Sequence, residues 1–278
     1  MDDLSIPCVV HLLQLRPGEF RRFSDELLEL VDAPVHAATR GYALINLAMH
    51  CQIRGDASCA LRWAESFTLR WAKENAAASG GRLFQFMLSW AQVLQGWALV
   101  RVGRRREGQD VLWSGIGLLR ELGAKAYFLY SLGLLADVSL LLGQVEEGLA
   151  RVNEAWGLME ETGERVLEAE LHRLQGELLR VAGKEGDAMR SLLRAAVVAH
   201  RQRAHLFELR ARVALARQLR DSGHPDSARR GLERLCGRFA PDLEVPEFQE
   251  ARALLASLRP TPGSPPHPPR ESPPGAAR

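Results

Sequence analysis

Apolar residues recur along most of the chain at the three- and four-residue intervals of amphipathic helices, and glycines interrupt this pattern at regular places. A helical apolar pattern runs from Leu132 to Leu142, Gly143-Gln144 follows, and a second helical pattern runs from Val145 to Met159. A glycine between two such patterns is typical of the left-handed residue that ends one helix and turns the chain into an antiparallel second helix. The pattern therefore predicts helix hairpins joined at glycines.

The glycines between these hairpins repeat with a fixed period. Four of them are 40 residues apart: Gly103, Gly143, Gly183 and Gly223. A fifth, Gly55, lies 48 residues before Gly103, and a small, polar loop insertion around residues 76–81 accounts for the difference. Gly123 and Gly163 are also 40 residues apart and close the second helices of two units. This repeat predicts five helix hairpins over residues 37–240.

Small side chains occur at two fixed offsets from each turn glycine. Seven residues before the glycine the chain has Ala48, Gly96, Ala136, Gly176 and Ala216. Five residues after it the chain has Ala60, Gly108, Gly148, Ala188 and Ala228. Two helices approach to the usual separation of about 8–10 Å only where the side chains at the crossing are small. The offsets therefore predict where the two helices of each hairpin cross.

These small residues around a turn glycine resemble the packing pattern of tetratricopeptide repeats, although the units are longer than the usual ~34 residues and few aromatic anchors are present. Residues 143–179 and 243–258 also resemble the C-terminal repeat region of large bacterial signalling ATPases, and the phrase beginning at Gly163 is the most specific part. In those proteins the region follows an ATP-hydrolysing module and sometimes a class III nucleotide cyclase or a DNA-binding regulator domain. The resemblance implies an all-α, right-handed solenoid of tetratricopeptide-like hairpins; a generic helix-hairpin solenoid is the alternative.

The two ends of the chain differ from its middle. Residues 1–36 predict a partial N-terminal repeat, with Phe23 where a small residue is expected, and this suggests that something once preceded it. Residues 241–259 predict a C-terminal capping helix that begins at Pro246. Residues 260–278 contain eight of the 14 prolines and predict a disordered tail, because they cannot bury apolar area.

Composition narrows the class of protein. Hydrophobic residues make up 46% of the chain and charged residues 25%, which is typical of a core-forming protein and excludes a membrane protein or a wholly disordered chain. Leu, Ala, Arg and Glu dominate, and these residues favour helices. The net charge of +2 provides no overall field for nucleic acid or anionic lipid. We find no signal peptide or apolar stretch long enough to cross a bilayer.

The four cysteines lie in apolar helical patterns and have no CxxC spacing: Cys8, Cys51, Cys59 and Cys236. This arrangement predicts neither a zinc site nor a disulfide framework, and it favours the reducing cytoplasm as the location.

Catalytic chemistry is not indicated. Glu168 and His172 lie one helical turn apart and with Glu164 offer a possible metal or acid–base group, but a partly exposed ion pair is the preferred interpretation. Gly183-Lys184 does not form a phosphate-binding loop, because Glu185 occupies the place of the magnesium-binding hydroxyl. The sequence predicts no catalytic residue, metal or cofactor.

A run of arginines at residues 104–106 and further arginines between residues 201 and 220 raise the question of nucleic-acid binding. Glu107, Asp110 and Glu208 interrupt these basic stretches, and aromatic residues do not form a stacking series. Solvated helix faces are therefore the preferred interpretation, and we expect no direct contact with nucleic acid.

The candidate site is the inner, concave surface. In tetratricopeptide-like superhelices the first helix of each unit faces inward, and helical periodicity selects positions 13, 10, 6, 3 and 2 residues before the turn glycine. The predicted partner-binding residues are Tyr42, Gln52, Trp90, Trp97, Arg101, Tyr130, Asp137, Glu170, Arg173, Glu177, Arg180, Arg210, Arg217 and Arg220; Ile45, Met49, Leu140 and Asp221 share this face. The groove would run from aromatic to arginine-rich. We expect the arginines to be exposed, and the two tryptophans to lie in either groove or core.

The resulting hypothesis is a non-catalytic scaffold that binds a segment of a protein partner in the concave groove, aromatic residues and arginines being the usual anchors of interfaces. The alternative is a regulatory or sensor segment of a signal-transducing ATPase or transcriptional regulator, with the catalytic modules outside this chain. The predicted partner is a protein or peptide, possibly an ATPase or cyclase module, and not a membrane. An enzyme would require a cluster of polar, titratable groups in one pocket.

Overall fold

A computed structural model describes residues 17–71, 81–239 and 245–258. The described residues form helices and turns without a strand, which confirms the predicted all-α class. The helices are α2 (Pro17–Asp32), α3 (Ala37–Ile53), α4 (Ala57–Glu65), the π-helical turn η1 (Ser66–Trp71), α6 (Arg82–Arg101), α7 (Arg105–Glu121), α8 (Lys125–Leu142), α9 (Val145–Thr162), α10 (Glu168–Val181), α11 (Glu185–Arg201), α12 (His205–Asp221), α13 (Pro225–Cys236) and α14 (Pro246–Ser257). The start of the predicted partial repeat, most of the loop insertion and the predicted tail lie outside the described residues.

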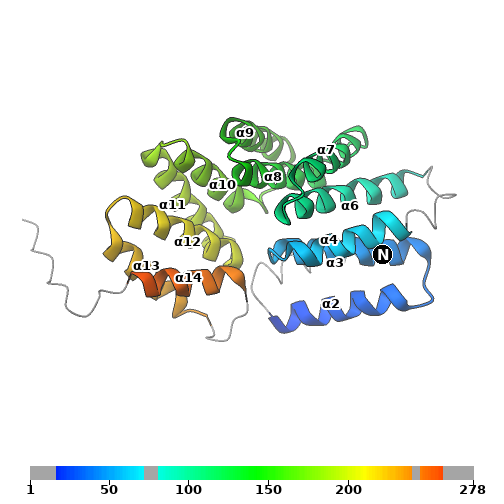
Figure 1. Cartoon of the computed structure of the whole chain (residues 1–278), viewed down its shortest axis with the longest axis horizontal. Helices are drawn as coiled ribbons and strands as arrows, with labels where there is room; N and C mark the ends of the chain where they lie inside the picture. Colours follow the sequence, from blue (N-terminus) through cyan, green and yellow to red (C-terminus); the bar gives the residue numbers. More distant parts are fainter. Residues whose placement is uncertain (1–16, 72–80, 240–244, 259–278) are drawn as a thin grey trace, which may run out of the picture.

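Consecutive helices pack as hairpins, and the hairpins form an arc (Figure 1). The pairs are α3 with α4, α6 with α7, α8 with α9, α10 with α11, and α12 with α13. The first helix of each pair also packs against the first helix of the next pair, and α14 packs against α12. The inner layer of the arc therefore consists of α3, α6, α8, α10, α12 and α14.

The turn glycines adopt the left-handed backbone conformation that the repeat predicts. Positive φ angles occur at Gly55, Gly103, Gly123, Gly143, Gly163, Gly183 and Gly223. At Gly143, for example, φ is 73°, and the amide of Gln144 donates to the carbonyl of Ser139 at 2.8 Å, which satisfies a carbonyl at the end of α8. Arg203 has a φ of 56° and lies 40 residues after Gly163, so the turn period continues there without a glycine.

The two columns of small residues lie at helix crossings. A Cβ added to Gly96 would lie 2.7 Å from the carbonyl oxygen of Gly108, and one added to Gly108 would lie 2.7 Å from the carbonyl oxygen of Gly96. A Cβ added to Gly176 would lie 3.2 Å from the carbonyl oxygen of Ala188. These contacts confirm the predicted crossings of α6 with α7 and of α10 with α11.

The α8–α9 crossing is shifted along the helix. A Cβ added to Gly148 would lie 3.2 Å from the Cβ of Ser139, one residue row beyond Ala136, and 2.6 Å from Leu178 of α10. Gly148 therefore makes room for the next hairpin as well as for its own partner helix.

The cysteines correct one prediction. Cys51 and Cys59 are joined by a disulfide, and their Cα atoms are 5.6 Å apart. The Gly55 turn folds α4 back on α3 and brings two residues that are eight positions apart to the same level. The absence of a CxxC spacing was therefore no guide, and the argument from cysteines to a reducing compartment fails. Among the described helices none is long and apolar enough to cross a membrane.

Candidate functional site

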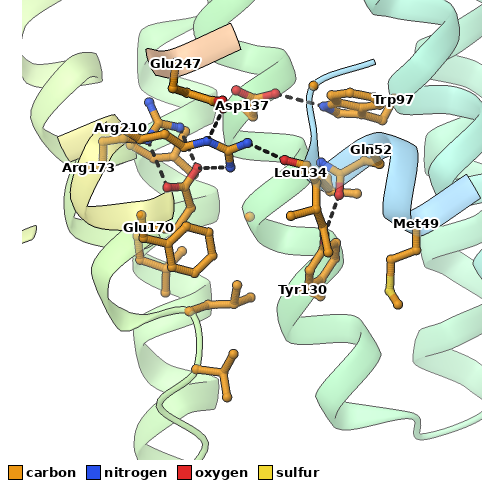
Figure 2. A pocket seen from close by; sticks show the side chains of 18 of the residues that line it. Met49, Gln52, Trp97, Tyr130, Leu134, Asp137, Glu170, Arg173, Arg210 and Glu247 are labelled. Carbon is orange, nitrogen blue, oxygen red and sulfur yellow. Dashed lines mark hydrogen bonds and ion pairs between the residues drawn. The ribbon is translucent and has the colours of Figure 1, made fainter. Parts of the chain in front are cut away.

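The inner surface of the arc contains a cavity of about 600 Å³. Its walls come from α3, α6, α8, α10, α12 and α14 and from the connection between α9 and α10. Figure 2 shows apolar and aromatic side chains on one side and a group of paired charges on the other. A volume of this size is typical of small-molecule sites, which occupy ~300–1,000 Å³.

Two rows of side chains run along this surface at positions that are equivalent in the repeat. The first inner row consists of Trp90, Tyr130, Glu170 and Arg210. The second inner row consists of Trp97, Asp137, Glu177 and Arg217. Because the first helices of consecutive hairpins are neighbours, the 40-residue period places each residue beside its equivalent in the next hairpin.

The α6 and α8 part of these rows is mainly aromatic. The rings of Trp90 and Tyr130 meet edge to face with their centroids 5.3 Å apart, and Tyr127 meets Trp90 in the same way at 5.0 Å. Trp97 is buried, and its Nε1 donates a hydrogen bond of 2.9 Å to Oδ2 of Asp137. This half forms the apolar wall of the cavity.

Asp137 ends the aromatic part and begins the ionic part. Its Oδ2 lies 2.6 Å from Nη2 of Arg101, in addition to the hydrogen bond from Trp97. Burial raises the pKa of this carboxyl, but the positive charges of Arg101 and Arg173 and the two hydrogen bonds outweigh burial and hold the pKa below its usual value. Asp137 is therefore ionised in the neutral range.

The α10 and α12 part of the rows is a ladder of ion pairs. Arg173 forms a bidentate pair with Glu170, with N–O distances of 3.0 and 2.7 Å. Burial raises the pKa of Glu170, yet Arg173 and Arg210 outweigh it, and the net pKa lies below the usual value. Glu177 lies 3.8 Å from Arg173 and 3.6 Å from Arg217.

Arg210 joins the two ends of the arc. Its Nε donates to Oε1 of Glu247 on α14 at 2.7 Å, and its Nη1 lies 3.7 Å from Oε1 of Glu170 on α10. Its Nη2 donates to the carbonyl oxygen of Ile53, the last residue of α3. Beside this contact the hydroxyl of Tyr130 donates to Oε1 of Gln52 (Figure 2). The cavity is therefore closed between the first and the last hairpins.

The structure brings together most of the predicted inner-surface residues. Eleven of the fourteen line the cavity, and the exceptions are Tyr42, Arg180 and Arg220. Tyr42 packs against the hydrophobic core, Arg180 lies 3.7 Å from Glu177, and Arg220 pairs with Asp221 at 2.8 Å. Whether these residues bind a partner stays a prediction.

Two expectations about exposure change. Trp90 and Trp97 are only 4% and 2% exposed, so both are core residues that present an edge to the cavity. The arginines are not all exposed, because the side chains of Arg173 and Arg210 are 12% and 16% accessible. Their carboxylate partners are responsible, since a buried guanidinium requires an ion pair.

Sequence reasoning missed Phe207, Glu247 and Glu250, all of which line the cavity. Phe207 lies sixteen residues before Gly223, as Tyr127 lies before Gly143, and one further helical turn in the offset pattern would have found both. Glu247 and Glu250 belong to α14, which no turn glycine follows, so no offset could be counted for them. Among the described residues no group of three or more His, Cys, Asp or Glu is placed to hold a metal ion.

Comparisons with known proteins agree with this fold. No family model matches the chain. The sequence is 39% identical to an uncharacterized protein of Rhizobium meliloti (strain 1021) over 121 residues, which are 43% of this chain and 12% of that protein.

Among solved structures, the chain resembles a signal transduction ATPase with numerous domains (STAND) protein with a tetratricopeptide repeat sensor, from Pyrococcus horikoshii. The TM-score is 0.58 at 14% identity, and the match covers 90% of this chain and 38% of that one. The predicted resemblance to the repeat region of a signalling ATPase is thus confirmed as a likeness of fold.

Proposed function

We propose that this chain is a non-catalytic regulatory repeat segment that senses an occupant of its inner cavity. It is a right-handed solenoid of about five 40-residue units, preceded by a partial unit and followed by the cap α14. It serves a larger signalling protein, an ATPase or a transcriptional regulator, whose catalytic modules lie outside this chain. The likeness of fold to a STAND protein with a tetratricopeptide repeat sensor supports this assignment.

One observation carries the proposal: the cavity lies between the two ends of the arc. Its walls include Met49 and Gln52 at the end of α3, Tyr130 in the middle, and Glu247 at the start of α14. An occupant therefore contacts the first and the last hairpins at once. Its binding free energy is able to change how firmly the ends hold together, which is the differential interaction that a sensor requires.

The protonation states of the cavity support a binding role over catalysis. General acid–base catalysis works best with a group whose pKa is near the working pH. Here burial raises the pKa of the Tyr130 hydroxyl, and neighbouring arginines keep the pKa of Asp137 and of Glu170 below the usual values. The titratable groups are therefore held in fixed charge states by one another.

The rim of the cavity supports a second candidate function, the binding of a segment from a protein partner. The side chains of Arg180, Arg217 and Arg220 are 34%, 34% and 43% accessible. They extend the inner surface beyond the cavity, and an acidic segment is the complementary partner. A scaffold of this kind would bind along the groove instead of inside it.

Gly133 provides the test of the cavity. It is a buried residue of α8 that lines the cavity, and a Cβ added there would meet nothing within 4 Å. Gly133→Leu therefore fills the cavity without displacing its walls. Gly117→Leu is the matched control, because Gly117 is an exposed helical glycine of α7 whose Cβ would also meet nothing within 4 Å.

The experiment is equilibrium dialysis of the purified chain against a small-molecule extract of bacterial cells, read by mass spectrometry. Compounds retained by the native chain and by Gly117→Leu, and lost from Gly133→Leu, are the expected result. Equal retention by all three chains would contradict a cavity-based sensor. Capture of a protein that is lost when Arg180 and Arg220 are changed to Glu, and not in Gly133→Leu, would instead favour the scaffold.

A further inference from the structure

The chemistry of the cavity walls identifies the class of its occupant, on the premise that the cavity is the sensing site proposed above. We infer that the cavity binds a small organic cation that carries an aromatic or other apolar body. The inference rests on three features of the walls: their aromatic side, their surplus of carboxylates, and the pairing of every cavity arginine.

The aromatic side accommodates the apolar body. Trp90, Tyr127 and Tyr130 are held in edge-to-face contact with one another, so their orientation is fixed before anything binds. Tyr130 also donates its hydroxyl hydrogen bond to Gln52, and this leaves its ring as the surface beside the cavity. Gly133 adds free space on the same helix, because it has no side chain. Burial of apolar surface against such a wall provides most of the binding free energy of a small ligand.

The charged side has more negative than positive groups. Six carboxylates line the cavity, and the guanidinium groups of four arginines face them. Arg180 approaches Glu177 from outside the wall as a fifth cation. Glu164 has no ion pair within the described part of the chain, and its Oε1 accepts a hydrogen bond of 3.0 Å from the amide of Val166. The Oε2 of Glu247 is buried and has no hydrogen-bond partner among the described residues.

The arginines are unavailable to an anion. Each cavity arginine already contacts a carboxylate, in the pairs Arg101–Asp137, Arg173–Glu170, Arg210–Glu247 and Arg217–Glu250. An anionic ligand would have to displace one of these carboxylates and leave it unpaired, which costs more than a new pair gains. A cation needs no such exchange, because it meets the uncompensated charge of Glu164 and of the second oxygen of Glu247.

The test uses three probes of similar shape and different charge: tryptamine, a cation; tryptophol, neutral; and indole-3-acetate, an anion. Isothermal titration with the full chain should give tryptamine the highest affinity, at least tenfold above tryptophol, and indole-3-acetate the lowest. Higher salt should narrow the difference between tryptamine and tryptophol, because a part of the attraction is electrostatic. Equal affinities for the three probes, or tighter binding of indole-3-acetate, would overturn the inference.

Two substitutions separate charge from shape. Glu164→Gln keeps the acceptor for the Val166 amide and removes the charge, so tryptamine should bind about fivefold more weakly and tryptophol unchanged. Glu121→Gln, on an exposed carboxylate of α7 outside the cavity, should leave both affinities unchanged. Gly133→Leu should abolish binding of all three probes, and tryptamine binding that survives it would place the site elsewhere and overturn the inference.

The outcomes distinguish this inference from the proposed function. If no probe binds and Gly133→Leu still loses a cellular compound, the sensor stands and the cationic class is wrong. If the compound that Gly133→Leu loses is an acid or a neutral sugar, the cationic class is again wrong. If tryptamine binds in the cavity but does not alter the distance between α4 and α14, the ligand class stands and the sensor is wrong.

Discussion

The two halves of the inner surface have the same backbone arrangement and opposite chemistry. In the half formed by α6 and α8, repeat-equivalent positions hold Trp90 and Tyr130, which pack as rings. In the half formed by α10 and α12, the same positions hold Glu170 and Arg210, which form part of a buried ion-pair ladder. The fold specifies which residues become neighbours, and the residue types then decide whether the contact is apolar or ionic.

The difference matters because the two kinds of contact respond differently to change. Aromatic contacts lose free energy in proportion to the surface and shape that a substitution removes. A buried ion pair contributes little net stability while it is intact, but removal of one partner leaves an uncompensated charge. The ionic half should therefore be the more sensitive to single substitutions, and the aromatic half the more tolerant of changes in pH.

The largest expected effect is that of Arg210→Met. The change leaves Glu170 and Glu247 without their shared cation, and we expect the free energy of unfolding to fall by about 3–5 kcal/mol. Urea denaturation followed by circular dichroism measures it. Arg220→Met, which removes a partly exposed arginine paired with Asp221, is the control and should change stability by less than about 0.5 kcal/mol. Equal effects of the two substitutions would show that the ladder is not buried in solution.

A pH-dependent effect should come from the amino-terminal region, through His50. Burial, with a smaller contribution from Arg54, lowers the pKa of this imidazole to about 4. The unfolded chain binds the proton below pH 6.5 and the folded chain does not, so stability is lost as the pH falls from about 6.5 towards 4, by on the order of 3 kcal/mol. His50→Gln should lack this dependence. A His50→Gln profile that still falls as steeply over this range would assign the acid sensitivity to other groups.

The carboxylates of the ionic half work in the opposite part of the scale. Because their pKa values are lowered, the stability that Asp137 and Glu170 contribute is complete above their usual pKa values and is lost only as the pH falls below that range. Acid unfolding should therefore have a His50 phase first and a carboxylate phase at lower pH.

Two glycines on neighbouring inner helices should respond in opposite directions to the same substitution. Gly96→Ala forces a Cβ against the backbone of α7, at 2.5 Å from the amide nitrogen of Leu112, and should lower stability by about 2 kcal/mol. Gly133→Ala places a Cβ in open space inside a helix and should raise stability by about 0.5–1 kcal/mol. Thermal unfolding of the pair measures both, and a loss at Gly133 would mean that the cavity is filled.

The smallest expected effect is a gain in stability at Arg203. Its φ of 56° lies in the left-handed region, where a non-glycine residue is strained, and its side chain is exposed. Arg203→Gly should raise the midpoint of thermal unfolding, corresponding to about 1 kcal/mol. Arg201→Gly, within helix α11, should lower it, and a loss of stability at both positions would argue against the left-handed turn.

Much of this architecture could be predicted from the sequence, because it depends on backbone requirements that only certain residues meet. The glycine period located the turns, and the small residues located the crossings of α6 with α7 and of α10 with α11. The Arg203 turn was missed because the tertiary arrangement imposes its backbone conformation on an unfavourable residue. The disulfide between Cys51 and Cys59 was missed because it depends on how a hairpin aligns two residues in space.

The inner face could be predicted by offset, but its electrostatics could not. Helical periodicity selected eleven cavity residues without information on their partners. The burial of Arg210 depends on Glu247, which comes from a helix that the repeat pattern does not number, and on the carbonyl of Ile53, which is 157 residues away. A groove expected to be arginine-rich is therefore a cavity in which carboxylates outnumber arginines.

The most direct test of the central claim is the distance between the two ends of the arc in solution. Fluorophores attached through unnatural amino acids at Ser58 of α4 and Gln249 of α14, both exposed, report it by single-molecule energy transfer. We predict one narrow population for the native chain, and a shift to lower transfer in Arg210→Met but not in Arg220→Met. Indistinguishable distributions for the native chain and Arg210→Met would contradict closure of the cavity by its two ends.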